Sequence, residues 1–78
     1  MSYPKISPEG IIGMATTSDN QYVFVGCDMK LRQYRIADHT LVKEYPLSRS
    51  IMSVITSFDS KDVFVGLEDG YIRHYRID

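Results

Sequence analysis

Side chains that could do chemistry are few in this chain and do not cluster. Its 78 residues include one cysteine, Cys27, and two histidines, His39 and His74. A zinc site requires several such ligands at a defined spacing, and these three residues match no such spacing. We therefore expect no metal site, and we interpret His39 as a turn residue and His74 as a hydrogen-bonded packing residue.

Sequence motifs of catalysis are missing as well. The chain has no Gly-x-Ser-x-Gly sequence for a serine nucleophile and no glycine-rich loop that would bind phosphate. Carboxylates stand close together only in predicted turns, at Asp59 with Asp62 and at Glu68 with Asp69, where turn formation explains them. The sequence therefore predicts a protein that is not an enzyme and that binds no cofactor.

Four arginines lie in two short segments, 32–35 and 73–76, that share one pattern. In an extended strand Arg32 and Arg35 point to opposite faces, so the arginines do not form one basic band. We expect them to pair with acids of the neighbouring structural unit. The candidate acids are Asp28, Glu44, Glu68 and Asp78. A formal net charge of −1 also argues against a nucleic-acid partner.

Composition narrows the class of protein further. Hydrophobic residues make up 44% of the chain, which is ordinary for a folded globular domain. A single cysteine cannot form an internal disulfide, and the first residues lack the apolar run of a signal peptide. No segment reaches the length needed to span a membrane. We expect a cytoplasmic protein without membrane contact.

The elements that carry these residues occur twice along the chain. The sequence VFVG at 23–26 returns at 63–66, and RQYRI at 32–36 returns as RHYRI at 73–77. The displacement is about 40 residues, with Glu68 as an insertion. A repeat of this period, built from short strands, is typical of a propeller blade. Such repeats bury their apolar faces only against neighbouring repeats.

Each repeat divides into strands rich in β-branched and aromatic residues, separated by turn sequences. Gly70 can adopt the positive φ that a tight hairpin requires. No helical periodicity is present, so we predict an all-β fold with blades of four antiparallel strands. The predicted strands cover residues 11–16, 22–26, 31–36, 40–45, 51–57, 63–67 and 71–77.

The second repeat lacks a fourth strand, and the start of the chain supplies one. Residues 2–6 align with residues 42–46, and the prolines Pro4 and Pro46 suit an edge position. We therefore divide the chain into three parts. Residues 1–10 form an outer strand that closes the second blade of a neighbouring copy, residues 11–47 form blade 1, and residues 48–78 form blade 2 without its own outer strand.

On these residues the chain resembles the WD40-repeat family, whose members are β-propellers of four-stranded blades. The resemblance covers both repeats, although Tyr34 and Tyr75 stand where the family usually has tryptophan. Arg35 and Arg76 stand where it usually has aspartate, and the Gly-His pair expected before each first strand is absent. The matching segments are residues 57–61, 65–66, 69–70 and 72–75.

The resemblance implies a ring, which two blades cannot close alone. We expect copies to assemble head to tail into a homotetramer of eight blades, with a homotrimer of six blades second. The chain then resembles an excised fragment or a designed self-assembling unit, and its function is that of a non-catalytic scaffold. The predicted interface residues are Tyr3, Pro4, Lys5, Ile6, Tyr71, Arg73, Tyr75 and Ile77.

An alternative function is a platform for recognising a peptide or protein. Turn residues at one rim of the ring would carry it, because exposed Met and Tyr are enriched in interface cores. The opposing interpretation is that these side chains only cover neighbouring blades. An enzyme site created at the ring axis is a distant third hypothesis. The predicted rim residues are Asp28, Met29, Lys30, Arg49 and Tyr71.

Overall fold

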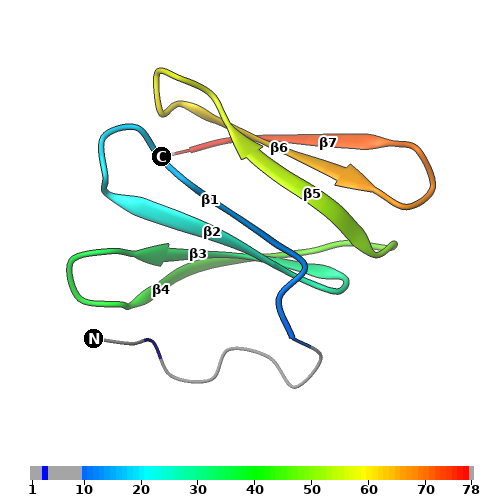
Figure 1. The fold of residues 1–78 in the computed structure, drawn as a ribbon, viewed down its shortest axis with the longest axis horizontal. Coiled ribbons are helices and arrows are strands. Elements are labelled where there is room, and N and C mark those ends of the chain that lie inside the picture. The colour runs from blue at the N-terminus through cyan, green and yellow to red at the C-terminus, as the bar shows by residue number, and fades with distance from the viewer. Residues whose placement is uncertain (1–2, 4–9, 78) are drawn as a thin grey trace.

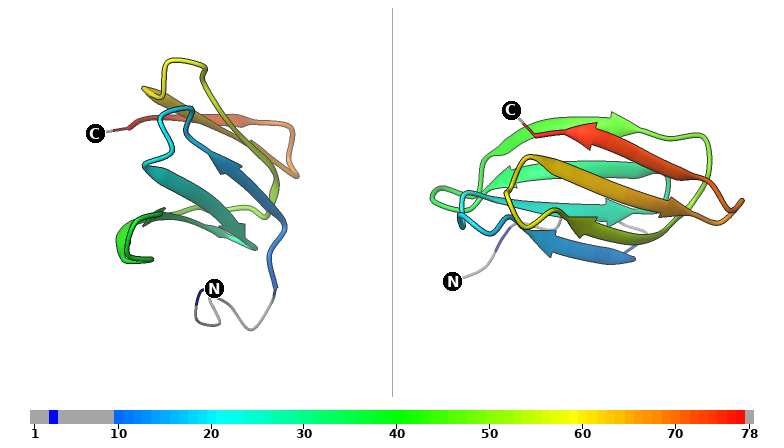
Figure 2. Two further views of the ribbon diagram at one scale, coloured as in Figure 1. Left: turned by 60° about the vertical axis from the view of Figure 1, so that its left-hand side comes forward. Right: turned by 90° about the horizontal axis from the view of Figure 1, so that it is seen from above.

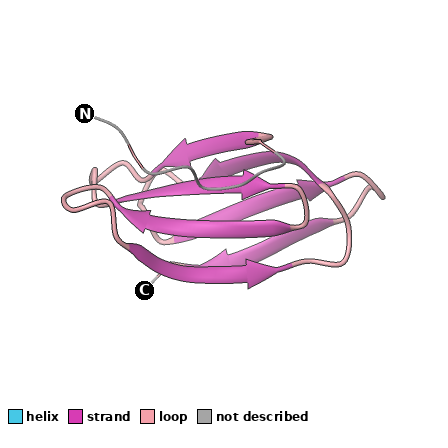
Figure 3. Cartoon of the chain, turned by 90° about the horizontal axis from the view of Figure 1, so that it is seen from below, coloured by secondary structure: helices cyan, strands magenta, loops and turns pink. Residues whose placement is uncertain are grey.

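The computed structural model describes residue 3 and residues 10–77. These residues form strands and turns with no helix, as Figure 3 shows, so the described part has no helix that could cross a membrane. The strands are β1 (Gly13–Thr16), β2 (Tyr22–Cys27), β3 (Lys30–Arg35), β4 (Leu41–Pro46), β5 (Ile51–Thr56), β6 (Asp62–Leu67) and β7 (Ile72–Arg76).

The strands form two antiparallel sheets. Sheet 1 has the order β1-β2-β3-β4, and sheet 2 has the order β5-β6-β7. All seven predicted strands are present, with bounds that move by one or two residues. The all-β class and the four-stranded first unit are thereby confirmed. Two register irregularities, at Gln33/Tyr34 and at Ile51/Ser53, were not predicted.

Turn chemistry explains where the first hairpin of each repeat bends. The Thr17 hydroxyl donates to Asp19 at 2.5 Å, and the amide of Gln21 donates to the same carboxylate oxygen at 3.1 Å. The second repeat uses Ser57 and Asp59 in the same way, at 2.7 Å. Gly70 has a φ of +89°, as its hairpin position predicted.

The main core lies between the two sheets, which stack as layers in Figure 2. We call the faces that meet there the inner faces and the opposite ones the outer faces. The inner strands β1 and β5 lie side by side in Figure 1. Buried side chains fill the space between the layers. They are Phe24, Leu31 and Tyr45 from sheet 1, and Ile51, Val54, Val63, Val65 and Leu67 from sheet 2.

A second buried cluster lies on the outer face of sheet 1. Alternation along β2 places Val23, Val25 and Cys27 on this face, opposite to Phe24. Tyr34 from β3 joins them. Tyr3 and Ile36 pack against the cluster, so this outer face is partly covered within the single copy.

Candidate functional site

The outer face of sheet 2 carries apolar side chains that no element of the described chain covers. The register pairs Ile55 with Phe64 and Gly66 with Ile72 on this face. Ile72 is 72% exposed, whereas Leu31, its equivalent in the first repeat, is fully buried in the core. An exposed apolar sheet face of this kind is a candidate interaction surface.

Part of the outer face of sheet 1 shows the same contrast. Met14 on β1 pairs with Val25 and is 60% exposed. Its equivalent Val54 is 6% exposed, because it packs against sheet 1 in the core. Ile11 is likewise exposed, whereas its equivalent Ile51 is buried. Each repeat thus exposes side chains whose counterparts in the other repeat lie between the sheets.

His74 lies at the centre of the edge strand β7, on the outer face of sheet 2. Its ring stacks on Phe64 with centroids 4.7 Å apart and an interplanar angle of 11°. Its Nε2 lies 2.8 Å from Oδ1 of Asp62, and Nε of Arg76 lies 3.6 Å from the same oxygen. The side chain is therefore a hydrogen-bonded packing residue, as the sequence predicted. His39 adopts a φ of 61° in the turn between β3 and β4, which matches its predicted role.

Tyr3 makes a contact that repeats one found between the sheets. Its ring meets Tyr34 at a centroid distance of 5.7 Å and stacks on His39 at 4.1 Å. Between the sheets, Tyr45 of β4 meets Tyr75 at 4.5 Å, and Tyr75 is the repeat equivalent of Tyr34. Tyr3 therefore packs on Tyr34 of sheet 1 in the way that Tyr45, on the outer strand β4, packs on Tyr75 of sheet 2.

Sequence reasoning missed this equivalence between Tyr3 and Tyr45. The dipeptide Tyr-Pro occurs at 3–4 and again at 45–46, which would have aligned the start of the chain two positions away from our register. Of the predicted interface residues at the start of the chain, only Tyr3 is described. Pro4, Lys5 and Ile6 lie outside the described residues.

The predicted interface residues near the end of the chain lie on or next to β7. Tyr75 and Ile77 pack against the core, on the inner face of sheet 2, and Arg73 shares that face by alternation. Tyr71 precedes the strand and is exposed. Within the described residues β7 pairs with β6 along one edge only. Its other backbone edge can therefore accept a further strand.

The predicted rim residues come together at one end of the sheets. Ser50 donates a hydrogen bond to Asp28 at 2.9 Å, and Nε of Arg49 lies 3.7 Å from Asp69. Backbone bonds also tie Leu47 to Met29 and Glu68 to Ser50. Met29, Lys30, Arg49 and Tyr71 are all exposed there. Ser50 and Arg49 hold the turn aspartates of the two repeats.

The predicted pairing of arginines between units is wrong for three of them. Arg32 contacts Glu44 of the adjacent strand at 2.8 Å, and Arg35 contacts Asp38 of its own hairpin at 3.2 Å. Arg76 pairs with Asp62 in its own sheet. Cross-strand register sets these partners, because it places Arg32 directly opposite Glu44. The Glu44 contact also raises the pKa of Arg32.

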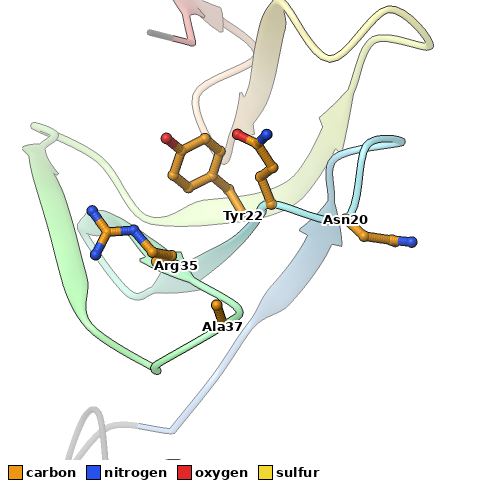
Figure 4. Close-up of a pocket in the computed structure, with 5 residues that line it drawn as sticks. Asn20, Tyr22, Arg35 and Ala37 are labelled. Carbon is orange, nitrogen blue, oxygen red and sulfur yellow. The ribbon is translucent and has the colours of Figure 1, made fainter.

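A pocket of about 270 Å³, whose lining residues Figure 4 draws, lies at the end of the β2–β3 pair opposite to the rim residues. It is lined by Asn20, Gln21, Tyr22, Arg35 and Ala37. In the second repeat, Asp62 stands in place of Tyr22 and pairs with Arg76, the equivalent of Arg35. The lining offers no nucleophile with an adjacent base, so it does not form a catalytic constellation. Within the described residues, no three His, Cys, Asp or Glu side chains group to hold a metal ion.

Comparison with known proteins adds information about the fold. No protein-family model matches the chain, and no curated protein matches it. Among solved structures, it is similar to the β-propeller domain of Cps50 (Swd1) from Myceliophteria thermophila, with a TM-score of 0.69 and 10% sequence identity. The match covers 86% of this chain and 25% of that domain, so the chain spans about a quarter of its length. The two sheets therefore resemble part of a β-propeller.

Proposed function

We propose that this chain is a non-catalytic structural scaffold whose copies assemble head to tail into a closed β-propeller. Each copy contributes two blades, and residues 2–6 of one copy supply the outer strand of blade 2 in the preceding copy. The likeness to a propeller fragment supports the blade architecture. The exposed outer faces support assembly, because apolar sheet faces and open strand edges are commonly covered by a partner.

The contact between Tyr3 and Tyr34 carries this proposal. It repeats the contact between Tyr45 and Tyr75, in which the first tyrosine belongs to the outer strand of a blade and the second to the next blade. Tyr3 is therefore placed as if it belonged to the outer strand of a blade that precedes sheet 1. In the proposed ring, that blade is sheet 2 of a second copy, where no described residue pairs with the second edge of β7.

Ring size follows from the number of blades per copy. A head-to-tail contact gives a closed ring when the rotation between copies divides a full turn. Four copies give eight blades and three copies give six, and we favour the tetramer. Each added junction removes one pair of outer faces from water, so the closed ring buries more apolar surface than any open chain of the same copies.

The proposal is tested by deleting residues 1–6 and measuring mass by size-exclusion chromatography with light scattering. We expect the full chain to elute as a closed oligomer and the deleted chain to fall to a single copy or an open mixture. Tyr3→Ser should weaken assembly, and Tyr3→Phe should retain it because the ring contact remains. An unchanged copy number after the deletion would refute the strand exchange.

A second candidate function is recognition of a peptide or protein at the rim. The contacts of Ser50 with Asp28 and of Arg49 with Asp69 favour it, because they gather exposed Met29 and Tyr71 at one end. Met29→Ser combined with Tyr71→Ser should reduce capture of such a partner and leave the copy number unchanged. If assembly is lost in this double variant, the rim serves the ring instead of a partner.

A further inference from the structure

The interface between the two sheets packs two large side chains of sheet 1 against three valines of sheet 2, beside Ile51 and Leu67. The inner face of sheet 1 presents Phe24 and Leu31, and the inner face of sheet 2 presents Val54, Val63 and Val65. Large side chains that enter the spaces between small ones give the dense packing found in protein interiors. This interface can serve as a template, because both sheets come from the same sequence repeat.

The two outer faces carry the same two sets in the opposite sheets. The outer face of sheet 2 has Phe64 and Ile72, which are the equivalents of Phe24 and Leu31. The outer face of sheet 1 has Met14, Val23 and Val25, which are the equivalents of the three valines. Equivalents of both sets are thus present on the outer faces of each copy, but they face away from each other.

In the template, Gly26 of sheet 1 lies where side chains of sheet 2 approach its backbone closely. A Cβ atom added to Gly26 would lie 3.0 Å from Cγ2 of Ile51 and 3.2 Å from Cγ2 of Val54. Gly66 is the equivalent of Gly26 and lies on the outer face of sheet 2. It leaves the corresponding space there for Ile11 and Met14 of a second copy, which are the equivalents of Ile51 and Val54.

Pairing of two identical faces fits less well. Two outer faces of sheet 2 would set Phe64 and Ile72 against their own copies, large against large. A contact between different faces instead repeats the packing of the template.

We propose that the outer face of sheet 2 docks on the outer face of sheet 1 of a second copy, with Phe64 and Ile72 as the buried anchors. This inference rests on the proposed assembly and names the surfaces and the orientation that produce it. His74 occupies the position of Gln33, which is buried in the template. In the docked state, His74 and its partner Asp62 are therefore covered by the second copy.

The test uses one substitution on each face, at residues that are exposed in the single copy. Met14→Asp blocks the outer face of sheet 1, and Ile72→Asp blocks the outer face of sheet 2. Each variant alone should have the mass of one 9.0 kDa chain. A mixture of the two should form a 1:1 heterodimer and nothing larger, because each variant retains one intact face of the opposite kind.

Native mass spectrometry reads all outcomes, and circular dichroism checks that each variant is folded. Met29→Asp, at the rim and away from both faces, is the control that should keep the parent mass. Homodimers of either single variant would show that identical faces pair, and a mixture that stays monomeric would also overturn the inference. If either single variant keeps the oligomeric mass of the unsubstituted chain, the substituted face is not part of the contact between copies. If the unsubstituted chain is itself a single copy, the proposed assembly is refuted. This result differs from an oligomer that the two face substitutions do not affect, which would refute only the docking faces.

Discussion

The two halves of this chain contain the same segment, VFVG, in two different environments. Phe24 in β2 is fully buried between the sheets, whereas Phe64 in β6 lies on an outer face and is only half-buried. The valines beside them are buried in both halves. Local sequence therefore determines the strand, and the neighbouring sheet determines which face becomes core.

Polar residues at the equivalent positions 33 and 74 differ in the same way. Gln33 is buried and accepts a hydrogen bond from the Tyr45 hydroxyl at 3.3 Å. His74 is exposed and is held by Asp62 and the ring of Phe64. Each polar group finds its partner on the adjacent strand, Gln33 on β4 and His74 on β6. Both arrangements can tolerate burial, because each polar group has a partner.

The largest expected difference between the halves concerns the two phenylalanines. Phe24→Ala should lower the free energy of unfolding by about 3–5 kcal/mol, because it leaves a cavity in the core. Phe64→Ala should cost about 1 kcal/mol in the single copy. Chemical denaturation of each variant in a background that blocks assembly, such as Met14→Asp, measures both values. Equal losses would contradict the assignment of Phe64 to an uncovered face.

The glycines should differ by a smaller amount. Gly26→Ala should destabilise the chain by about 1–3 kcal/mol, because the added methyl group meets Ile51 and Val54 across the core. At Gly66 the added Cβ would meet only Oγ of Ser53, at 2.8 Å, and this side chain can rotate away. Gly66→Ala should therefore cost less in the single copy, as thermal denaturation can determine. The reverse order would show that sheet 2 has no free outer face.

The buried hydrogen bond of the first half predicts a further difference. Tyr45→Phe removes the donor to Gln33 and should cost about 1 kcal/mol. His74→Gln gives the second half the residue of the first, at an exposed position, and should change stability by less than about 0.5 kcal/mol in the single copy. Urea titrations of the two variants provide the comparison. A larger loss for His74→Gln would mean that its contacts with Phe64 and Asp62 are structural supports.

The smallest expected effects are equal in the two halves. Hydrogen bonds from the Thr17 side chain and the Gln21 amide lower the pKa of Asp19 below its usual 3.8, and Ser57 and Lys61 do the same for Asp59. A lowered carboxyl pKa contributes stability that is present above pH 3.8 and is lost as the pH falls through the folded value. Asp19→Asn and Asp59→Asn should each flatten the loss of stability in acid. The melting temperature of each variant, measured against pH, tests this. A clearly different dependence on pH in the two variants would show that the two turns are not equivalent.

The sequence was sufficient to predict the strands and the repeat. Runs such as VFVG, bounded by turn residues, favour strands wherever they stand, and the matched aspartates at 19 and 59 make matched turns. The partners of the arginines were not predictable in this way. Arg32 pairs with Glu44 because the register sets them opposite each other, and register depends on bulges that single residues do not reveal.

The candidate surfaces were predicted in part. The turns that carry the predicted rim residues meet at one end of the sheets, and the binding role of these residues stays a prediction. The pocket at Tyr22 and Arg35 was missed, since it arises from a cross-strand pair. The contact of Tyr3 with Tyr34 was not predicted, and the repeated Tyr-Pro dipeptide was the available signal; the outer strand expected over residues 2–6 stays a prediction.

The measurement that tests the central claim most directly is the native mass of the full chain in dilute neutral buffer. Head-to-tail assembly predicts one closed species, of four copies or alternatively three, whose copy number does not rise with protein concentration. A series that grows with concentration would mean open chains instead of a ring. A stable species of a single 9.0 kDa chain would contradict the account.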